Sequence, residues 1–314
     1  MRQVKIALVG AGLMAEEHIR AFRAVPNVKI SGIHSRTSER AAALAERYNI
    51  PSVCDSVDDL YRETKADLVV VAVPELQSRE VCDRVFQYPW CALIEKPVGY
   101  NLTDAREIAS EADRAERMAF VGLNRRHYGS TRAVLQEVMF SDEERLVHIF
   151  DQQSPKAALA AGRPSLVVDN WMYANSIHII DYLRLFCRGD ILEIDHVIKW
   201  NPENPRFILV KLHYSSGDIA IYNAVWDAPG PWSVSVTTQE KLWEMRPLER
   251  ATIQVYGSRD YKSIGSDPWD EEFKPGLRFQ AEEAVKAARG EPNCLPSLKE
   301  GLMTMELVKS IYGV

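Results

Sequence analysis

VKIALVGAGLMA, residues 4–15, is the stretch that decides the fold of this 314-residue chain. The apolar run Val4–Val9 predicts a buried strand, and the glycines after it predict a tight turn that opens a helix. Gly10 permits the turn, Gly12 lets the backbone approach a pyrophosphate closely, and Ala15 lets the helix pack near the sheet. Because the amino terminus of the helix then faces negative charge, the stretch predicts a dinucleotide site rather than a purely structural turn. The residues of the turn expected to contact the cofactor are Gly10, Ala11, Gly12, Leu13 and Met14.

The second predicted strand, Val28–His34, ends without the carboxylate that would bind the ribose hydroxyls of NAD. Ser35, Arg36 and Thr37 follow it and suit a 2′-phosphate, because a guanidinium supplies charge and two hydroxyls act as donors. The sequence therefore favours NADP over NAD. The alternative is that Arg36 stacks over the adenine or is solvated, in which case NAD also binds.

A later apolar run, residues 91–94, ends in Glu95-Lys96-Pro97. The carboxyl end of such a strand lies near the nicotinamide of a bound dinucleotide, where Lys96 can donate a hydrogen bond to a substrate oxygen. The alternative is a solvated surface lysine, which is the commonest fate of this residue type. The bond between Lys96 and Pro97 is also a candidate for a cis peptide. The cofactor-binding residues predicted at strand ends are Ser35, Arg36, Thr37, Val73, Pro74, Glu95 and Lys96.

Strand-like and helix-like segments alternate over residues 1–124, which is typical of a parallel sheet with helical crossovers. The pattern then changes over residues 125–314: Ser154–Ser165 is expected to be a loop, Asn170–Phe186 a helix, and strands dominate residues 191–256. We therefore predict an α/β fold, with a doubly wound Rossmann domain over residues 1–124 and a substrate-binding α+β domain over residues 125–314. The two helices that close the chain are free to pack back on the first domain.

The predicted strand Asp218–Trp226 is apolar on both faces. A strand of this kind needs cover on both sides. One face is expected to pack on helices of the same chain, and the other on a second subunit.

Composition excludes several classes of partner. The formal net charge is −6 and no cluster of lysine and arginine stands out, which argues against nucleic acid and anionic membranes. No apolar stretch is long enough to cross a bilayer, and the amino terminus is too short and too charged for a signal peptide. The five cysteines are odd in number and lack CxxC spacing, so we expect reduced thiols in the cytoplasm.

Four motifs follow one another along the chain with the order and spacing of one enzyme family. They are Gly10-Ala11-Gly12-Leu13-Met14-Ala15, Glu95-Lys96-Pro97, Val121-Gly122-Leu123-Asn124-Arg125-Arg126 and His178-x-x-Asp181. With them, the chain resembles the glucose-fructose oxidoreductase/inositol dehydrogenase/rhizopine-catabolism (Gfo/Idh/MocA) family nearly from end to end. The resemblance implies a Rossmann domain followed by an α+β domain with an open, mostly antiparallel sheet. It also implies NAD(P)-dependent oxidation or reduction of sugars, cyclitols or sugar nucleotides by subunits that associate through that sheet, as a homodimer or homotetramer.

The resemblance further implies two catalytic residues. In the family, the lysine of Glu-Lys-Pro and a histidine on a helix of the second domain flank the reacting carbon, and they correspond to Lys96 and His178. His178 would act as a general base when an alcohol is oxidised and as a general acid when a ketone is reduced. Asp181 lies one helical turn further on and is expected to fix the helix or the imidazole rather than to react. A metal site is not expected, because no third ligand has suitable spacing.

Two positions depart from the family pattern. The aspartate that usually stands four residues before the histidine is Ala174 here, and Tyr173 or Asn175 are candidates to substitute for it. The histidine often found four residues after the proline of the fourth strand is Ser78, which changes a contact on the cofactor side only. With Ala174, a reductase that uses NADPH is as credible as a polyol dehydrogenase.

The polar cluster at residues 125–128 is a candidate for binding phosphate or carboxylate on a substrate, with interdomain ion pairs as the alternative. We expect Arg126 and Tyr128 to bind the substrate, and Trp171 to stack on a sugar unless it belongs to the helix core. The sequence thus predicts an NADP(H)-preferring oxidoreductase that acts on the CH–OH groups of a sugar, in particular a nucleotide-linked or otherwise anionic one. A non-catalytic NAD(P)-sensing regulator on the same fold and a reductase of a non-sugar ketone or imine are the alternatives.

Overall fold

The computed structural model describes residues 2–314, and residue contacts divide the chain into two compact units. Unit 1 comprises the chain up to Asn124 together with Glu271–Leu302. Unit 2 comprises Arg125–Asp270 together with Met303–Val314. The sequence analysis drew one boundary, after residue 124, whereas a late segment of the chain also lies in unit 1. Within residues 2–314, no helix combines the length and the apolar character that crossing a bilayer demands.

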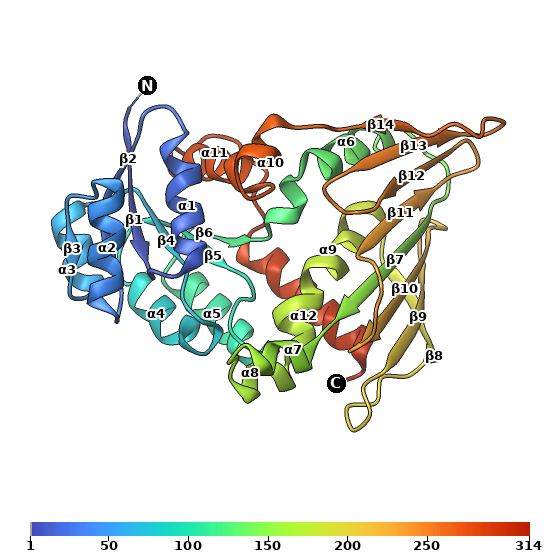
Figure 1. Cartoon of the computed structure of the whole chain (residues 1–314), viewed down its shortest axis with the longest axis horizontal. Coiled ribbons are helices and arrows are strands. Elements are labelled where there is room, and N and C mark those ends of the chain that lie inside the picture. The colour runs from blue at the N-terminus through green and yellow to red at the C-terminus, as the bar shows by residue number, and fades with distance from the viewer. Residues whose placement is uncertain (1) are drawn as a thin grey trace. The chain divides into compact units, whose positions relative to one another are not determined.

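Unit 1 contains a six-stranded parallel sheet with the strand order β3-β2-β1-β4-β5-β6 (Figure 1). The order reverses between β1 and β4, as it does in a Rossmann fold, and ligands of such sheets bind outside the carboxyl ends of the strands at this point. Residues Ile6 to Val9 pair with Leu68 to Val71, so the two strands end level with each other. The strands are β1 (Val4–Val9), β2 (Val28–His34), β3 (Val53–Cys54), β4 (Leu68–Val71), β5 (Cys91–Glu95) and β6 (Ala119–Gly122).

Helices cover both faces of this sheet, which is why its central strands are apolar on both sides. Every residue of β4 is buried, as the sequence predicts for a parallel strand covered on both faces. One core cluster joins β1 and β2 to α1 and α2, and α11 from the late segment completes it with Leu277, Ala281, Ala284 and Val285. The helices of unit 1 are α1 (Leu13–Arg23), α2 (Ser38–Tyr48), α3 (Val57–Thr64), the short η1 (Glu75–Gln77), α4 (Ser78–Val85), α5 (Leu102–Arg114) and α11 (Leu277–Ala288).

Unit 2 contains an eight-stranded sheet with the order β14-β13-β12-β11-β7-β10-β9-β8. β7 and β10 run parallel, and the other neighbouring strands are antiparallel, so the predicted mostly antiparallel sheet is confirmed. The strands are β7 (Leu146–Gln153), β8 (Ile191–Ile198), β9 (Phe207–Tyr214), β10 (Ile219–Trp226), β11 (Ser233–Thr237), β12 (Lys241–Met245), β13 (Ala251–Val255) and β14 (Lys262–Ile264).

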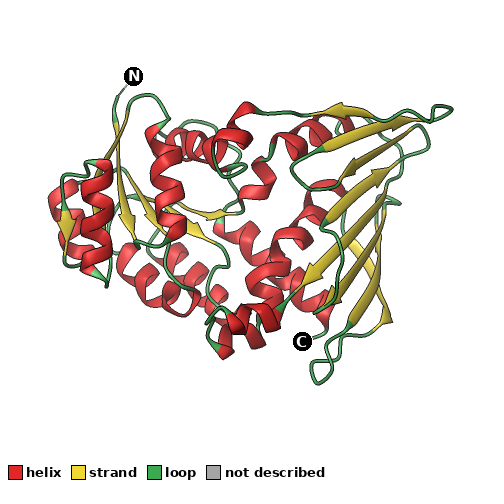
Figure 2. Cartoon of the chain, viewed as in Figure 1, coloured by secondary structure: helices red, strands yellow, loops and turns green. Residues whose placement is uncertain are grey.

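Helices α6, α9 and α12 lie on one face of this sheet (Figure 2). Burial alternates along the strands accordingly: in β10, Ala220, Tyr222, Ala224 and Trp226 are buried, and the residues between them are half-buried. Cover of the second face by another subunit stays a prediction. The helices are α6 (Gly129–Val138), α7 (Pro155–Ala160), α8 (Ser165–Asp169) and α9 (Ile177–Phe186), with η2 (Asn124–His127), α10 (Pro268–Glu272) and α12 (Leu298–Tyr312) crossing the limits of the units.

In unit 2, one expectation was wrong and another was incomplete. The expected loop Ser154–Ser165 contains α7, because Pro155 occupies a first helical position, where its fixed φ favours a helix. The expected single helix Asn170–Phe186 is a π-helical turn, Met172–Ser176, followed by α9. A wider turn of this kind leaves no mark in the spacing of apolar residues.

Candidate active site

The turn between β1 and α1 leaves room for close approach of a ligand. Gly10 has a φ of +113°, and a Cβ on it would lie 2.1 Å from the carbonyl oxygen of Ala72. Gly12 has an extended backbone, and a Cβ built on it would meet nothing within 4 Å. Gly10 is therefore required by the fold, whereas Gly12 opens onto the space that a pyrophosphate would need at the start of α1.

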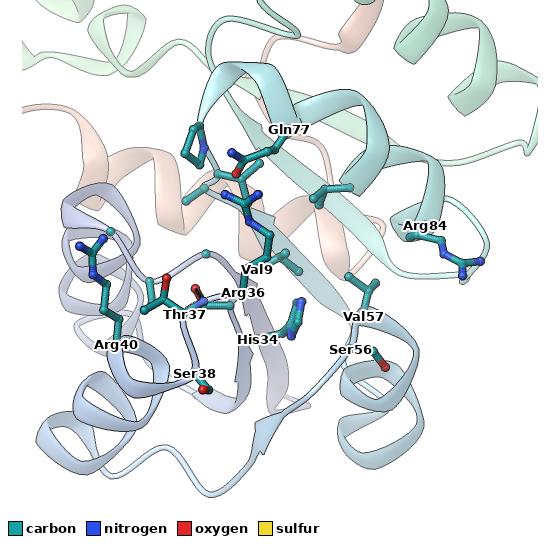
Figure 3. Close-up of a pocket in the computed structure, with 18 of the residues that line it drawn as sticks. Val9, His34, Arg36, Thr37, Ser38, Arg40, Ser56, Val57, Gln77 and Arg84 are labelled. Carbon is teal, nitrogen blue, oxygen red and sulfur yellow. Dashed lines mark hydrogen bonds between the residues drawn. The ribbon is translucent and has the colours of Figure 1, made fainter. Parts of the chain in front are cut away.

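A cavity of about 650 Å³ lies at the carboxyl ends of β1, β2 and β4 (Figure 3). This volume falls within the ordinary range for ligand pockets. Eight of the predicted cofactor-binding residues line it: Gly10, Ala11, Gly12, Ser35, Arg36, Thr37, Val73 and Pro74. The described wall of this cavity does not include the other four, Leu13, Met14, Glu95 and Lys96. The residues at the strand ends thus come together in the way that a bound dinucleotide requires.

Charges of both signs surround the cavity. Figure 3 shows Arg36 reaching from the end of β2 toward Gln77, with Arg40 and Arg84 on opposite sides. The acidic residues in the wall are Asp55, Asp58 and Glu80. The sequence analysis missed Asp55 and Asp58 because the strand before them, β3, has only two residues and no apolar run, and it missed Glu80 on α4 as well. The pairing of His34 with Cys54 sets Asp55 next to Ser35.

A buried hydrogen-bonded pair holds the end of β5. Oε1 of Glu95 lies 2.6 Å from Nε2 of His18 on α1, and His18 is 1% exposed. A Cβ on Gly122 would lie 3.1 Å from the same oxygen, so the neighbouring strand leaves room for this carboxylate. The pair fixes the residue just before Lys96, and the bond from Lys96 to Pro97 is cis. His18 was missed, although its place on the buried face of α1 marks an unusual position for a histidine.

His178 lies in the first turn of α9 and is 9% exposed. In the π-helical turn before it, the N–H of Ile177 donates to the carbonyl of Met172, five residues earlier. Ala174 lies inside this π turn, which takes more residues than an α turn, and His178 follows just after it. The missing family aspartate therefore falls where the helix itself is irregular, and π turns are frequent at functional sites.

Asn175 and Tyr173 are the two proposed substitutes for that aspartate, and Asn175 has a polar contact to the sheet. The side-chain amide of Asn175 donates to Oε1 of Gln153 on β7 at 2.8 Å. Tyr173 is 5% exposed. Asn175 thus ties the start of α9 to the end of β7.

Asp181 anchors α9. Nε and Nη2 of Arg126 donate to its two carboxylate oxygens at 2.6 and 2.7 Å, and the hydroxyl of Thr304 donates to it at 2.8 Å. The side chains of Arg126 and Asp181 are 10% and 3% exposed. Arg126, expected to bind a substrate, therefore directs its guanidinium to Asp181, and Asp181 stabilises the helix that carries His178.

A polar network lies beneath α9. Asp151 on β7 is fully buried and accepts hydrogen bonds from the hydroxyl of Tyr222 at 2.8 Å and from Nε2 of Gln153 at 2.6 Å. The hydroxyl of Tyr312 lies 2.8 Å from that of Tyr222 and 3.2 Å from that of Ser176. Burial raises the pKa of Asp151, while its hydrogen bonds oppose this shift. The sequence analysis missed Asp151, although the inward alternation of β7 places an acid there.

The remaining predicted substrate residues are largely enclosed. Tyr128 is 6% exposed, and burial raises the pKa of its hydroxyl. Trp171 is half-buried, and its indole N–H has no hydrogen-bond partner among residues 2–314. Over the same residues, no group of three or more His, Cys, Asp and Glu side chains is placed to hold a metal ion.

Comparison with known proteins identifies relatives of both the sequence and the fold. Residues 4–123 match the GFO_IDH_MocA oxidoreductase family, NAD-binding Rossmann fold. The chain is 21% identical over 238 residues to 4-carboxy-2-hydroxymuconate-6-semialdehyde dehydrogenase of a Sphingobium species, covering 73% of this chain and 74% of the relative. It is 24% identical over 201 residues to D-apiose dehydrogenase of Paraburkholderia graminis, covering 62% and 52%. Its fold is similar to that of aldose-aldose oxidoreductase from Caulobacter crescentus, with a TM-score of 0.83, 17% identity and coverage of 99% and 97%.

The matched segment contains the glycine turn, the strand ends around the cavity and Glu95-Lys96-Pro97. The predicted family, the α/β fold and the assignment as an oxidoreductase are therefore confirmed. Residues 4–123 thus form an NAD-binding Rossmann domain of the type found in the Gfo/Idh/MocA oxidoreductases, and dehydrogenases are among the relatives of the chain.

Proposed function

We propose that the chain is an NADP(H)-preferring oxidoreductase that interconverts a hydroxyl and a carbonyl group on a sugar, a cyclitol or a nucleotide-linked sugar. The observation that carries the proposal is the cavity at the ends of β1, β2 and β4, with Lys96 on the next strand of the same sheet. Ile94 pairs with Val71 and Glu95 pairs with Gly122, so Lys96 is the first residue after β5. When bound, the nicotinamide supplies or accepts a hydride.

The proposed roles follow from how each side chain is held. Lys96 donates a hydrogen bond to the reacting oxygen of the substrate, and His178 moves the proton of that oxygen. Glu95, fixed by His18, keeps the end of β5 in place. Asp181 stabilises α9, the helix of His178. A catalytic site of this kind depends on such supporting contacts for its geometry.

The names of the relatives support two substrate classes. D-apiose dehydrogenase and aldose-aldose oxidoreductase point to sugars, which is the class we propose. The Sphingobium relative is a dehydrogenase of a carboxylated semialdehyde, which favours a non-sugar carbonyl compound as the second candidate.

The test is turnover of the nicotinamide with a panel of substrates. We expect oxidation of NADPH with one or more ketosugars or oxidised sugar nucleotides, or reduction of NADP⁺ with the corresponding alcohols. Tight binding of the dinucleotide with no turnover by any sugar, cyclitol, ketone or imine of the panel would instead indicate a nucleotide-sensing regulator.

The NADP preference makes a separate prediction. Arg36→Gln should weaken NADPH binding about tenfold to a hundredfold and change NADH binding little, because a hydrogen bond to a charged group contributes about 1.5–3 kcal/mol. Arg40→Gln should have a smaller effect, since Arg40 lies on α2, beyond the end of β2. Fluorescence titration of both dinucleotides measures the four affinities. Equal affinity of the unmodified protein for NADH and NADPH would refute the preference.

A further inference from the structure

We propose that Arg125 binds an anionic group, a carboxylate or a phosphate, on the substrate of this enzyme. The inference rests on the proposed function, because it names the class of molecule that reaches His178. All the residues that carry it belong to unit 2.

Two contacts hold Arg125 in place: a hydrogen bond to its backbone carbonyl, and stacking of its guanidinium on an aromatic ring. Its carbonyl accepts a hydrogen bond from the hydroxyl of Tyr182 on α9 at 3.3 Å. Its guanidinium carbon lies 4.0 Å from the centre of the Trp232 ring. The indole N–H of Trp232 in turn donates to the carbonyl of Gln152 at 2.6 Å. Stacking engages the face of the guanidinium, so an anion can approach the N–H groups at its edge, in the plane of the group.

The positive charge of Arg125 has no ion-pair partner among residues 2–314. Its Nη1 is buried and forms no hydrogen bond over the same range. The neighbouring cation, Arg126, is by contrast paired with Asp181 through two hydrogen bonds. A buried donor without a partner costs about 1–3 kcal/mol, and more when it is charged. An incoming carboxylate or phosphate would remove this cost.

Asp151 does not supply the missing negative charge. Its carboxyl group already accepts hydrogen bonds from Tyr222 and Gln153, and burial raises its pKa, which disfavours the charged form. Arg125 interacts with Asp151 electrostatically but forms no ion pair with it within residues 2–314. The other polar neighbour of Arg125 is the neutral hydroxyl of Tyr128.

Contacts connect Arg125 to α9, the helix that carries the proposed acid–base residue His178. Tyr182, which binds its carbonyl, lies four residues after His178 on α9 and thus on nearly the same face. From the other side, Gln152 of β7 binds Trp232, and the adjacent Gln153 binds Asn175, three residues before His178. Two sets of contacts therefore connect Arg125 to the region of His178: one through its carbonyl and Tyr182, and one through its guanidinium, Trp232 and the end of β7.

The experiment measures binding and does not depend on turnover. The complex with NADPH is titrated calorimetrically with D-glucose, D-glucuronate and D-glucose 6-phosphate, which share a ring and differ in charge. We expect one or both anions to bind at least tenfold more tightly than glucose, and the better of the two identifies carboxylate or phosphate as the group recognised. Equal affinity for all three, including no detectable binding of either anion, overturns the proposal.

Matched variants connect the effect to Arg125. Arg125→Gln should abolish the preference for the anion. Arg125→Lys should keep part of it, because a lysine retains the positive charge but lacks the planar, paired N–H donors of a guanidinium. Trp232→Leu should reduce it, and Trp232→Phe should preserve most of it. Arg259→Gln, in an exposed loop between β13 and β14, should leave it unchanged. An anion preference that survives Arg125→Gln in a folded protein contradicts the proposal.

The outcome is separable from that of the proposed function. If anions bind through Arg125 but NADPH is not turned over, the anion subsite is supported and the proposed redox reaction is contradicted. If neutral sugars are turned over and anions are not preferred, the proposed redox reaction is supported and the anion subsite is contradicted.

Discussion

Replacing Lys96 by alanine is expected to lower kcat/KM about a hundredfold to a thousandfold, with most of the loss in kcat. Removal of one preorganised donor to a reacting oxygen typically costs about 3–4 kcal/mol of transition-state stabilisation. The dinucleotide affinity should change little, because Lys96 is not among the residues that line the described cavity. Steady-state kinetics and a fluorescence titration of NADPH separate the two quantities.

Lys29→Ala is the matched control for Lys96→Ala. Lys29 lies exposed on β2 in the same unit, and its loss should leave both kcat and the dinucleotide affinity unchanged. If Lys96→Ala keeps activity within tenfold of the unmodified enzyme, Lys96 has no part in the chemical step.

The two glycines of the first turn should respond to alanine in opposite ways. Gly10→Ala brings a Cβ against the carbonyl of Ala72 at a positive φ, which should destabilise the protein by about 2–6 kcal/mol through strain and overpacking. Gly12→Ala meets no neighbour and should change the free energy of unfolding by less than about 0.5 kcal/mol. Its methyl group occupies the space in front of α1, so NADPH affinity should fall roughly tenfold or more, or about 1.4 kcal/mol.

Urea unfolding and NADPH titration of the two variants test this contrast. A stable Gly12→Ala protein that binds NADPH as tightly as the unmodified chain would mean that no pyrophosphate approaches this turn. A Gly10→Ala protein of unchanged stability would show that the close contact with Ala72 relaxes at little cost.

The sequence predicted those parts of the fold that short segments decide. The strand Val4–Val9 and its glycine turn occur as expected. The side chain of Asn101 caps α5 by accepting the N–H of Asp104, and Glu300 accepts the N–H of Ser297 at the start of α12. Each of these features joins residues at most a few positions apart, so one stretch of sequence contains all the information.

The parts that escaped prediction join distant residues. His18 meets Glu95 across 77 positions, and neither residue indicates the other in the sequence. The cluster at residues 125–128 was read correctly as cationic, yet the choice between its arginines depends on Asp181, which lies 55 positions after Arg126. Composition can indicate that an anion site exists, but the partner that each arginine finds on folding decides which one stays available.

Helix α11 belongs to unit 1 but is synthesised long after the other elements of that unit. The first sheet is encoded by the chain up to Gly122, yet the core beside it is completed by residues that end at Ala288. At about 5–20 residues per second, a ribosome needs roughly 10–30 s to supply the stretch between them. During that interval, the apolar residues of unit 1 that pack against α11 lack this cover, and transiently exposed apolar surface of this kind is prone to aggregation.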